Sequence, residues 1–467
     1  MKFVPGRDYD PMAGNLSKRQ TFLFCCLLST IGILLYGHEA LSVRYVDNIS
    51  SIFDNYNLTS SELNASGSWP NYRHIWKDYY GTIPAFYNCQ EFAKGNVKNI
   101  SHYAFRGRIP LTKEPVLSME CDHIRRRVMG NTVYERVKHP YAIARNVYEN
   151  YYVQELLLAF SYSPSNMYCY AIDQKSQKAF KKHLKQLGNC LPNVIVLEKE
   201  YSFDSAGHRQ DQAHYDCSAD LLQYPGWEYL MFSQNADIFL KTPEEISEII
   251  SVLNGTAFTS MSNPIKSRIP KSKWTAKELK LFRNESQFSK DQLNKAMVIR
   301  KSPNHMFLPR AFVQAVNEKL NLTKMIDLFE SKKYGVDEML YITLLHADFL
   351  NLPGQMENSC IGRNIFRYVH WNFGNEKKCQ SFKKRHSICL IGMEYIPIIT
   401  KEPHIIANKI WPEWDFGAIM CMGEILYNRT NVDKKHKLNL KPYYNIPQVR
   451  EQSLKIQEKF NSSGFIC

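Results

Sequence analysis

Downstream of residue 139, the chain alternates between short apolar runs and segments whose apolar residues recur at helical spacing. Aromatic and β-branched residues fill three of the apolar runs, which predicts strands at 166–173, 193–197 and 227–232. Helical spacing between and after these runs predicts helices at 175–187, 211–222 and 243–253. Strands that alternate with helices are typical of an α/β fold with a mainly parallel sheet covered on both faces.

Local signals mark the ends of some of these elements. Thr242, Pro243 and Glu245 predict a helix start, with a capping box and a proline in the first turn. Gly188 is expected to cap the end of the first helix. The remaining apolar runs predict a helix that begins near Val336 and short strands at 256–261 and 388–391.

An apolar run at Thr21–Tyr36 precedes this region and is nearly long enough to cross a bilayer. Lys18 and Arg19 stand directly before it, and positive flanks stay on the cytoplasmic side. We therefore expect an uncleaved signal-anchor with the C-terminal body in the lumen; a cleaved signal peptide is the alternative. The expected organisation is a cytoplasmic tail at 1–20, a transmembrane helix at 21–36, a lumenal stem at 37–85 and a catalytic domain at 86–467.

Glycosylation sequons and net charge bear on the same question. Nine Asn-X-Ser/Thr sequons follow the apolar run, at Asn48, Asn57, Asn64, Asn99, Asn254, Asn284, Asn321, Asn428 and Asn461. They favour a lumenal body. The formal net charge of +14 is spread along the chain rather than gathered in one arm. In a lumenal protein it favours a membrane surface or a phosphate-bearing substrate as partner, and it argues against nucleic acid.

Ten of the twelve cysteines lie downstream of the apolar run. They are Cys89, Cys121, Cys169, Cys190, Cys217, Cys360, Cys379, Cys389, Cys421 and Cys467. Their spacing lacks the tight pairs of a zinc site, and cysteines in an oxidising compartment usually form disulfides. The residues by themselves leave the pairing open.

Several common catalytic signatures are absent from the sequence. There is no Gly-X-Ser-X-Gly elbow, His-Glu-X-X-His, phosphate loop or Gly-X-Gly-X-X-Gly, which counts against hydrolase, zinc-protease, kinase and dehydrogenase functions. The single Asp-X-Asp, at residues 8–10, falls on the expected cytoplasmic tail. Asp337 and Glu338 are adjacent on one helix, so they do not supply the two opposed carboxylates of a glycosidase.

Transfer of a sugar from a nucleotide donor needs a base for the acceptor hydroxyl and positive charge for the departing diphosphate. Glu338 is a candidate base, although acids are also favoured in a first helical turn because they complement the helix dipole. The cluster at 383–386 and Lys409 are candidate cations, although a basic cluster is also typical of a solvated face.

Six stretches now carry a family resemblance. In chain order they are HPYAIARNVYENYYVQELLLAFSYSPSNMYCYAID (139–173), DSAGHRQDQAHYDC (204–217), WEYLMFSQNADIFLKT (227–242), YGVDEML (334–340), RYVHWNF (367–373) and PHIIANK (403–409). Together they resemble the core-2/I-branching β1,6-N-acetylglucosaminyltransferase family (glycosyltransferase family 14), and they are most similar to its nematode members. The resemblance covers roughly residues 139–425.

That resemblance implies a glycosyltransferase A-type, Rossmann-like fold and a single-pass type II topology in the Golgi membrane. It also implies an inverting reaction that needs no metal or other cofactor. The implied enzyme transfers N-acetylglucosamine from UDP-GlcNAc to a 6-hydroxyl of an O-glycan or lactosamine chain. Two alternatives stay open: the same scaffold with another UDP sugar, such as glucose or xylose, and a catalytically silent lumenal protein that binds glycans or acts as a scaffold.

Carried over residue by residue, the resemblance implies that Glu338, in VDEMLY, is the catalytic base and that Lys409, in ANK, binds the diphosphate. His386 falls in the column of a diphosphate-binding arginine, with Arg385 one place before it. Because histidine carries little charge at neutral pH, we expect Arg385 to take over that role. Asp173 matches an acid near the uridine.

The acceptor region departs from the family pattern. Between residues 263 and 274 the candidates for acceptor binding are Lys266, Arg268 and Trp274. The family's disulfide pattern implies the pairs Cys89–Cys421, Cys121–Cys190, Cys169–Cys217 and Cys379–Cys389. Cys360 and Cys467 are left over and could pair with each other or with a second chain in a homodimer.

Overall fold

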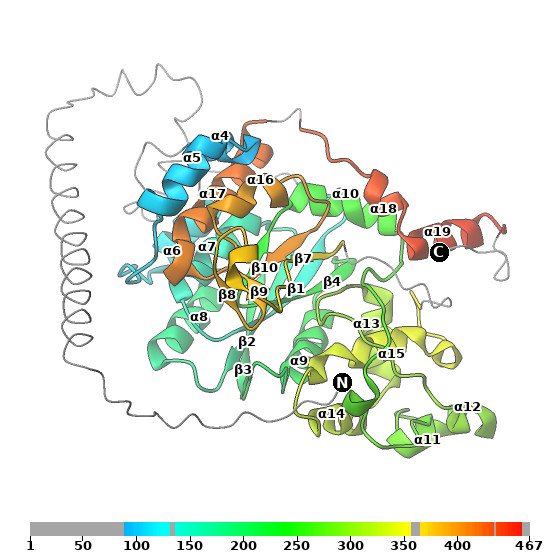
Figure 1. Ribbon diagram of the computed structural model, residues 1–467. Coiled ribbons are helices and arrows are strands. Elements are labelled where there is room, and N and C mark those ends of the chain that lie inside the picture. The colour runs from blue at the N-terminus through cyan, green and yellow to red at the C-terminus, as the bar shows by residue number, and fades with distance from the viewer. Residues whose placement is uncertain (1–87, 131–135, 356–364, 434–435, 460–467) are drawn as a thin grey trace, which may run out of the picture. The chain divides into compact units, whose positions relative to one another are not determined.

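A five-stranded sheet with the strand order β3-β2-β1-β4-β6 forms the centre of the computed structural model (Figure 1). Neighbours among the first four strands pair in parallel, and β6 joins β4 antiparallel. The strands are β1 (Tyr141–Val147), β2 (Met167–Asp173), β3 (Val194–Tyr201), β4 (Tyr229–Gln234) and β6 (Phe307–Pro309). The structure describes residues 88–130, 136–355, 365–433 and 436–459. The predicted α/β fold with a mainly parallel sheet is confirmed.

The two central strands, β1 and β2, are buried almost throughout. Every residue of β1 and the last six residues of β2 are buried, as expected for parallel strands with helices on both faces. The predicted helices between the strands are present as α8 (Lys178–Cys190), α9 (Gln210–Leu222) and α10 (Pro243–Leu253). Of these, α9 lies against β1 and β2, and α8 lies against β3.

The signals for helix ends were right in one case and wrong in another. Thr242 and Glu245 form the predicted capping box, with Pro243 at the first helical position. Gly188 does not cap α8, which continues through it to Cys190. A Cβ at position 188 would lie 3.1 Å from Cγ2 of Val196 on β3, so the glycine serves close packing of the helix on the strand.

A second, three-stranded sheet has the order β5-β10-β7. Its strands are β5 (Asp237–Phe239), β7 (Arg367–Val369) and β10 (Ile406–Asn408). Strand β10 runs parallel to β7 and antiparallel to β5, which follows β4 directly in the chain. A short hairpin of β8 (Lys384–Arg385) and β9 (Ile388–Cys389) stands beside this sheet in Figure 1. The second sheet therefore places β7 and β10, which come late in the chain, beside the segment that follows β4.

Further helices surround the two sheets (Figure 1). They are α4 (Cys89–Lys94), α5 (Val97–His102), α6 (Cys121–Met129), α7 (Tyr151–Ser161), α11 (Ala276–Leu279), α12 (Lys290–Asn294), α13 (Arg310–Lys319), α14 (Thr323–Glu330), α15 (Leu340–His346), α16 (Ile396–Ile399), α17 (Pro412–Asn431), α18 (Lys441–Tyr444) and α19 (Pro447–Ile456).

Two predicted elements differ from what the structure shows. Residues 256–261 do not form a strand, and Phe258 makes only an isolated bridge to Phe307. The helix expected near Val336 begins as a single 3-10 turn, Val336–Glu338, and becomes α-helical only at Leu340. In this way Glu338 stands on a turn before the helix rather than within it.

The four implied disulfides are confirmed: Cys89–Cys421, Cys121–Cys190, Cys169–Cys217 and Cys379–Cys389. Cys169–Cys217 ties β2 to α9 inside the core, where both cysteines are fully buried. Cys379–Cys389 closes a short loop that contains Arg385. Cys360 and Cys467 lie outside the described residues.

Several predictions concern the N-terminal part of the chain or its glycans. The tail, the signal-anchor and the stem up to residue 85 lie outside the described residues. Within the described part, no helix has the length and apolarity required to cross a membrane. Five of the nine sequon asparagines are described, and Asn99, Asn254, Asn284 and Asn321 are exposed. Asn428, on α17, is half-buried, which makes it the least accessible of the five.

Candidate active site

The carboxyl ends of β1, β2 and β4 meet at one edge of the central sheet. Asp173, the last residue of β2, is 8% exposed, and its Oδ1 accepts a hydrogen bond of 2.9 Å from the backbone N–H of Lys175. The hydroxyl of Ser176 then donates to the carbonyl of Tyr148, 2.8 Å away, which ties this turn to the end of β1. Open α/β sheets bind ligands at such an edge, so the position of Asp173 suits a ligand-binding role.

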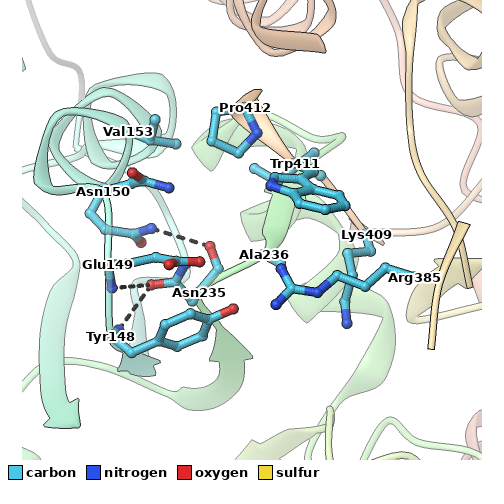
Figure 2. Close-up of a pocket in the computed structure, with 12 residues that line it drawn as sticks. Tyr148, Glu149, Asn150, Val153, Asn235, Ala236, Arg385, Lys409, Trp411 and Pro412 are labelled. Carbon is cyan, nitrogen blue, oxygen red and sulfur yellow. Dashed lines mark hydrogen bonds between the residues drawn. The ribbon is translucent and has the colours of Figure 1, made fainter. Parts of the chain in front are cut away.

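Asn235 holds one wall of a pocket at this edge (Figure 2). Its Oδ1 accepts hydrogen bonds from the backbone N–H groups of Tyr148, at 3.0 Å, and Glu149, at 3.3 Å. Its backbone carbonyl accepts from Nε2 of Gln154, on α7, at 3.2 Å. The residue after β4 thus fixes the loop after β1, and the Glu149 carboxylate faces the pocket from that wall (Figure 2).

Arg385 and Lys409 form the opposite wall of this pocket (Figure 2). They come from the β8–β9 hairpin and from the residue after β10, and the guanidinium of Arg385 lies 4.8 Å from the ring centroid of Trp411. Burial, together with the charges of Arg367 and Arg385, lowers the pKa of Lys409 to about 8. Among the described residues, no carboxylate lies within ion-pair distance of this ammonium. The wall is therefore suited to binding an anion.

His386 adjoins this wall but does not line the pocket. Its backbone has a positive φ of 51°, and its side chain is exposed. Partial burial lowers the pKa of its imidazole, and the charges of Lys409 and Arg385 lower it further. The histidine is therefore mainly neutral near pH 7, and Arg385 supplies the charge on this hairpin.

A buried charged cluster fixes the second sheet against the end of β4. The Oδ2 of Asp237 lies 2.8 Å from Nε2 of His305, and its Oδ1 accepts from Nε of Arg367 at 3.2 Å. Asn408 and the backbone N–H of Gln234 donate to the same carboxylate at 3.0 and 2.6 Å. Burial alone would raise the pKa of Asp237, but His305 and Arg367 hold it well below its usual range.

The cluster around Asp237 also positions the pocket wall that carries Lys409. Asn408 directly precedes Lys409, so the contact between Asn408 and Asp237 positions that lysine. Burial lowers the pKa of Arg367, and the carboxylates of Asp237 and Glu338 act in the opposite direction. The guanidinium of Arg367 is therefore attracted by the carboxylates of both Asp237 and Glu338. No local pattern in the sequence singles out Asp237 or Arg367 beyond their place in two of the family-like stretches.

Glu338 is one-quarter exposed and stands between two cations. Its Oε2 forms an ion pair with Nη2 of Arg268 and lies 3.4 Å from Nζ of Lys301. Its backbone carbonyl accepts a hydrogen bond of 2.8 Å from the N–H of Ser302. A carboxylate so held is fixed in position and partly accessible, as a general base must be.

Asp337, the preceding residue, has a different environment. Burial and the charge of Glu338 together raise the pKa of its carboxyl to about 7. The side-chain amide of Asn304 donates a hydrogen bond to Oδ2 of Asp337. The same amide donates to Oε1 of Gln210 at 3.4 Å, and this oxygen also accepts from Nε2 of Gln234. This polar chain links the turn that carries Glu338 to the end of β4.

The three candidate acceptor residues lie in different environments. Lys266 is exposed, and Arg268 contacts Glu338 as described above. Trp274 is only 6% exposed: its ring stacks on Phe329 at a centroid distance of 5.1 Å, and its Nε1 donates to the carbonyl of Pro270. The structure therefore does not support the expectation that Trp274 offers a face to a sugar, because that face is used in the core.

Two exposed aromatic rings lie beside the β8–β9 hairpin. Trp371 and Phe373 stack with their centroids 5.5 Å apart and their planes 3° from parallel, and they are 50% and 81% exposed. Asn372, between them, donates its backbone N–H to the carbonyl of Ser387 at 2.8 Å. In the sequence these two rings belong to the family-like stretch 367–373 and were assigned no role. Alternating aromatic residues in a strand-like segment were the signal available.

No group of three or more His, Cys, Asp or Glu side chains arranged to hold a metal ion occurs in the described ranges. Metal independence itself stays a prediction. What the site does contain is a pocket at the carboxyl edge of an α/β sheet, with a basic wall and a separate, partly exposed carboxylate. These are the parts that a transferase acting on a phosphorylated sugar donor requires.

Comparison with known proteins identifies the class. The model of the Core-2/I-Branching enzyme family matches residues 142–400, which is more than half of the chain, and the chain belongs to this family. It is therefore a hexosyltransferase of this family, and the resemblance predicted from the sequence is confirmed.

Three similar relatives share one name. The chain is similar to the beta-1,3-galactosyl-O-glycosyl-glycoprotein beta-1,6-N-acetylglucosaminyltransferase 3 of Rattus norvegicus, with 27% identity over 375 residues, 73% of this chain and 83% of the relative. The enzymes of that name from Homo sapiens and Ovis aries are 26% and 28% identical; they cover 68% and 73% of this chain, which covers 76% and 82% of them. A solved structure of the mannosyltransferase Ktr4p from S. cerevisiae aligns over 57% of this chain and 76% of its own, at 10% identity and a TM-score of 0.22, too low to support an argument.

Proposed function

We propose that this chain is an inverting, metal-independent β1,6-N-acetylglucosaminyltransferase with a glycosyltransferase A-type catalytic domain. It transfers N-acetylglucosamine from UDP-GlcNAc to a 6-hydroxyl of an O-glycan or lactosamine chain. The observation that carries the proposal is the arrangement of Arg385 and Lys409 on one pocket wall. Hydrogen bonds through Asp237, Gln234 and Asn304 connect this wall to the turn that carries Glu338. The names of the relatives support the donor and the linkage.

In the proposed reaction, the oxygen of the acceptor 6-hydroxyl attacks C1 of the donor sugar from the face opposite UDP. The new C1–O bond forms as the bond from C1 to the β-phosphate oxygen breaks, and its electron pair leaves with UDP. Glu338 takes the hydroxyl proton. A positioned base of this kind contributes roughly 10²–10⁴-fold to a rate.

The departing UDP carries the negative charge that develops in the transition state. Arg385 and Lys409 supply fixed positive charge for it, which is most effective in a partly buried site. The carboxylate of Asp237, the buried acid near Lys409, already accepts from four donors, so it is poorly placed to hold a cation instead. This supports transfer without a metal. Asp173, at the end of β2, is proposed to contact the uridine.

For the acceptor, we propose that Arg268 and the stacked pair of Trp371 and Phe373 form the binding surface. Exposed aromatic faces suit the apolar faces of sugar rings, and a guanidinium suits their oxygen atoms. Lys266 stays a candidate on the exposed turn before Arg268.

The topology is part of the same proposal. We place the catalytic domain in the Golgi lumen, anchored as a type II protein by residues 21–36. The Lys18–Arg19 flank supports this orientation. The four exposed sequon asparagines and the four disulfides in the described body are also consistent with a lumenal location.

The deciding experiment is a transfer assay with the full chain, purified from membranes in mild detergent. It would use a panel of UDP sugars and a core-1 disaccharide acceptor, with EDTA present throughout, and Glu338→Gln would be assayed beside the wild type. We expect metal-free transfer from UDP-GlcNAc that the variant loses. Transfer from UDP-glucose or UDP-xylose instead would change the donor and keep the mechanism. Activity only with added Mn²⁺ would contradict the roles given to Arg385 and Lys409, and folded protein without any transfer would favour the scaffold alternative.

A further inference from the structure

The segment 262–274 (SNPIKSRIPKSKW) covers the turn that carries Glu338 and contains four basic and no acidic residues. It is held there by hydrogen bonds to the segment 331–338. Nζ of Lys332 donates to the carbonyl of Ser267 at 3.1 Å, and Nε of Arg268 donates to the carbonyl of Tyr334 at 3.3 Å. The segment therefore forms one side of the approach to the proposed base.

Arg268 reaches Glu338 by passing directly over Gly335. A Cβ at position 335 would lie 1.1 Å from Nη2 of Arg268, so the glycine leaves the space that the guanidinium occupies. Lys301 approaches from the other side, and both cations contact the same oxygen, Oε2 of Glu338. Two partly exposed cations thus converge on one carboxylate oxygen.

Positive charge around Glu338 exceeds the negative charge available to neutralise it. Four further lysines of the covering segment or its partner segment are exposed: Lys266, Lys271, Lys273 and Lys333. Of the nearby acids, Glu330 pairs with Arg209 and Asp204 pairs with His208. An excess of one sign of charge around a site raises the local concentration of ligands that carry the opposite charge.

We propose that the acceptor glycan carries an acidic group, a carboxylate or a sulfate, that binds between Arg268 and Lys301. Binding of this group replaces Glu338 as the partner of the two cations. Glu338 is then free to accept the proton of the acceptor hydroxyl, so the charged substituent both selects the acceptor and releases the base. This inference rests on the function proposed above, because it assigns the substrate class of the same site.

The chemistry of the two side chains supports this choice of ligand. A guanidinium presents paired N–H groups that match two oxygens of a carboxylate or sulfate, and an ammonium beside it adds a third donor. Hydrogen bonds that involve a charged group are worth about 1.5–3 kcal/mol, which corresponds to roughly tenfold or more in binding. If the two cations served only to hold Glu338, neutral and acidic acceptors would react alike.

The test compares three acceptors that share one reacting 6-hydroxyl on N-acetylgalactosamine. The first is the neutral core-1 disaccharide, the second bears a 3-O-sulfate on its galactose, and in the third that galactose is oxidised to galacturonic acid. For the full chain, kcat/KM would be measured at low and high salt, and the affinity for each disaccharide would be measured by calorimetry without donor. We expect at least one acidic acceptor to be preferred by about tenfold or more at low salt, and the preference to shrink at high salt.

We expect Arg268→Gln and Lys301→Gln each to reduce the preference for the acidic acceptor. The ratio of kcat/KM for the acidic acceptor to kcat/KM for the neutral acceptor should fall toward one, while the affinity for UDP stays unchanged. Lys98→Gln, at an exposed lysine on α5, is the matched control and should keep the wild-type ratio. The sulfate and galacturonate arms separate the two sources of the acidic group.

Equal or better use of the neutral acceptor by the wild type would overturn the inference and leave the transferase function intact. If no acceptor reacted at all, the proposed function would fail, and the calorimetric comparison would still decide the inference. Tighter binding of an acidic disaccharide would support it, and equal binding would reject it.

Discussion

Asp337 and Glu338 are neighbours in the chain, yet their carboxyl groups stand in opposite electrostatic environments. Asp337 receives a hydrogen bond from Asn304 in a setting that raises its pKa to about 7, whereas Glu338 forms ion pairs with Arg268 and Lys301. The 3-10 turn at Val336–Glu338 separates the two side chains. As a result Asp337 contacts the amide of Asn304, whereas Glu338 lies between two cations.

Replacing the proposed base should abolish transfer without loss of donor binding. We expect Glu338→Gln to lower kcat by about 10²–10⁴-fold, because glutamine cannot accept the proton. Its affinity for UDP should stay close to that of the wild type, since Arg385 and Lys409 are untouched. Steady-state kinetics and calorimetry with UDP would measure both. Glu318→Gln, at an exposed glutamate of α13, is the control; a Glu338→Gln enzyme with normal kcat would refute the assignment.

Donor affinity should depend on pH through Lys409. Its pKa is lowered to about 8, so the ammonium is present at pH 7 and is lost as the pH rises through about 8. UDP binding should therefore weaken between pH 7 and 9. Lys409→Arg should keep the charge over this range and flatten the profile, because arginine stays protonated. Calorimetric titration of UDP at several pH values would show this; identical profiles for wild type and variant would exclude Lys409 as the titrating group.

Stability should depend on pH through Asp337. Its carboxyl has a higher pKa in the folded chain, about 7, than the ordinary value of 3.8 that applies when unfolded. The folded state therefore binds the proton more tightly, and this contribution to stability is present at low pH and is lost as the pH rises from about 4 to 7.

Asp337→Asn removes this titration. The difference in unfolding free energy, variant minus wild type, should be more positive at pH 8 than at pH 5. Urea denaturation at the two pH values measures the difference. An equal change in unfolding free energy at pH 5 and pH 8 would show that Asp337 does not titrate as described.

Two disulfides should differ in what their removal changes. Cys169–Cys217 spans 48 residues and Cys379–Cys389 spans 10, so loop-closure entropy gives contributions of about 4 and about 3 kcal/mol. Replacing the first pair with alanine should lower the melting temperature more. Replacing the second pair should chiefly raise KM for the donor, because that loop positions Arg385. Calorimetric melting and donor kinetics on both double variants would separate the effects, and an unchanged donor KM in the second would argue against a role for the hairpin.

Periodicity and local chemistry were enough to predict much of the central sheet. Strands β2 and β4 are buried, largely apolar runs, β3 begins with one, and α10 carries its own start signal. These are local properties, so the sequence expresses them directly. The wrong prediction of a helix end at Gly188 shows what local patterns cannot decide. A glycine suits both a helix end and close packing against β3, and only the position of the neighbouring strand distinguishes the two roles.

The assignment of Glu338, Lys409 and the disulfide pairs came from the family resemblance, because no local pattern specifies which distant residues meet. What the sequence by itself determined is the α/β class and the residues with suitable chemistry. Only the tertiary structure decided that Arg268 and Lys301 converge on Glu338, that Asp237 binds Arg367, and that Trp274 is buried. The physical reason is that charge pairing and burial depend on contacts between segments far apart in the chain: 70 residues separate Arg268 from Glu338, and 130 separate Asp237 from Arg367.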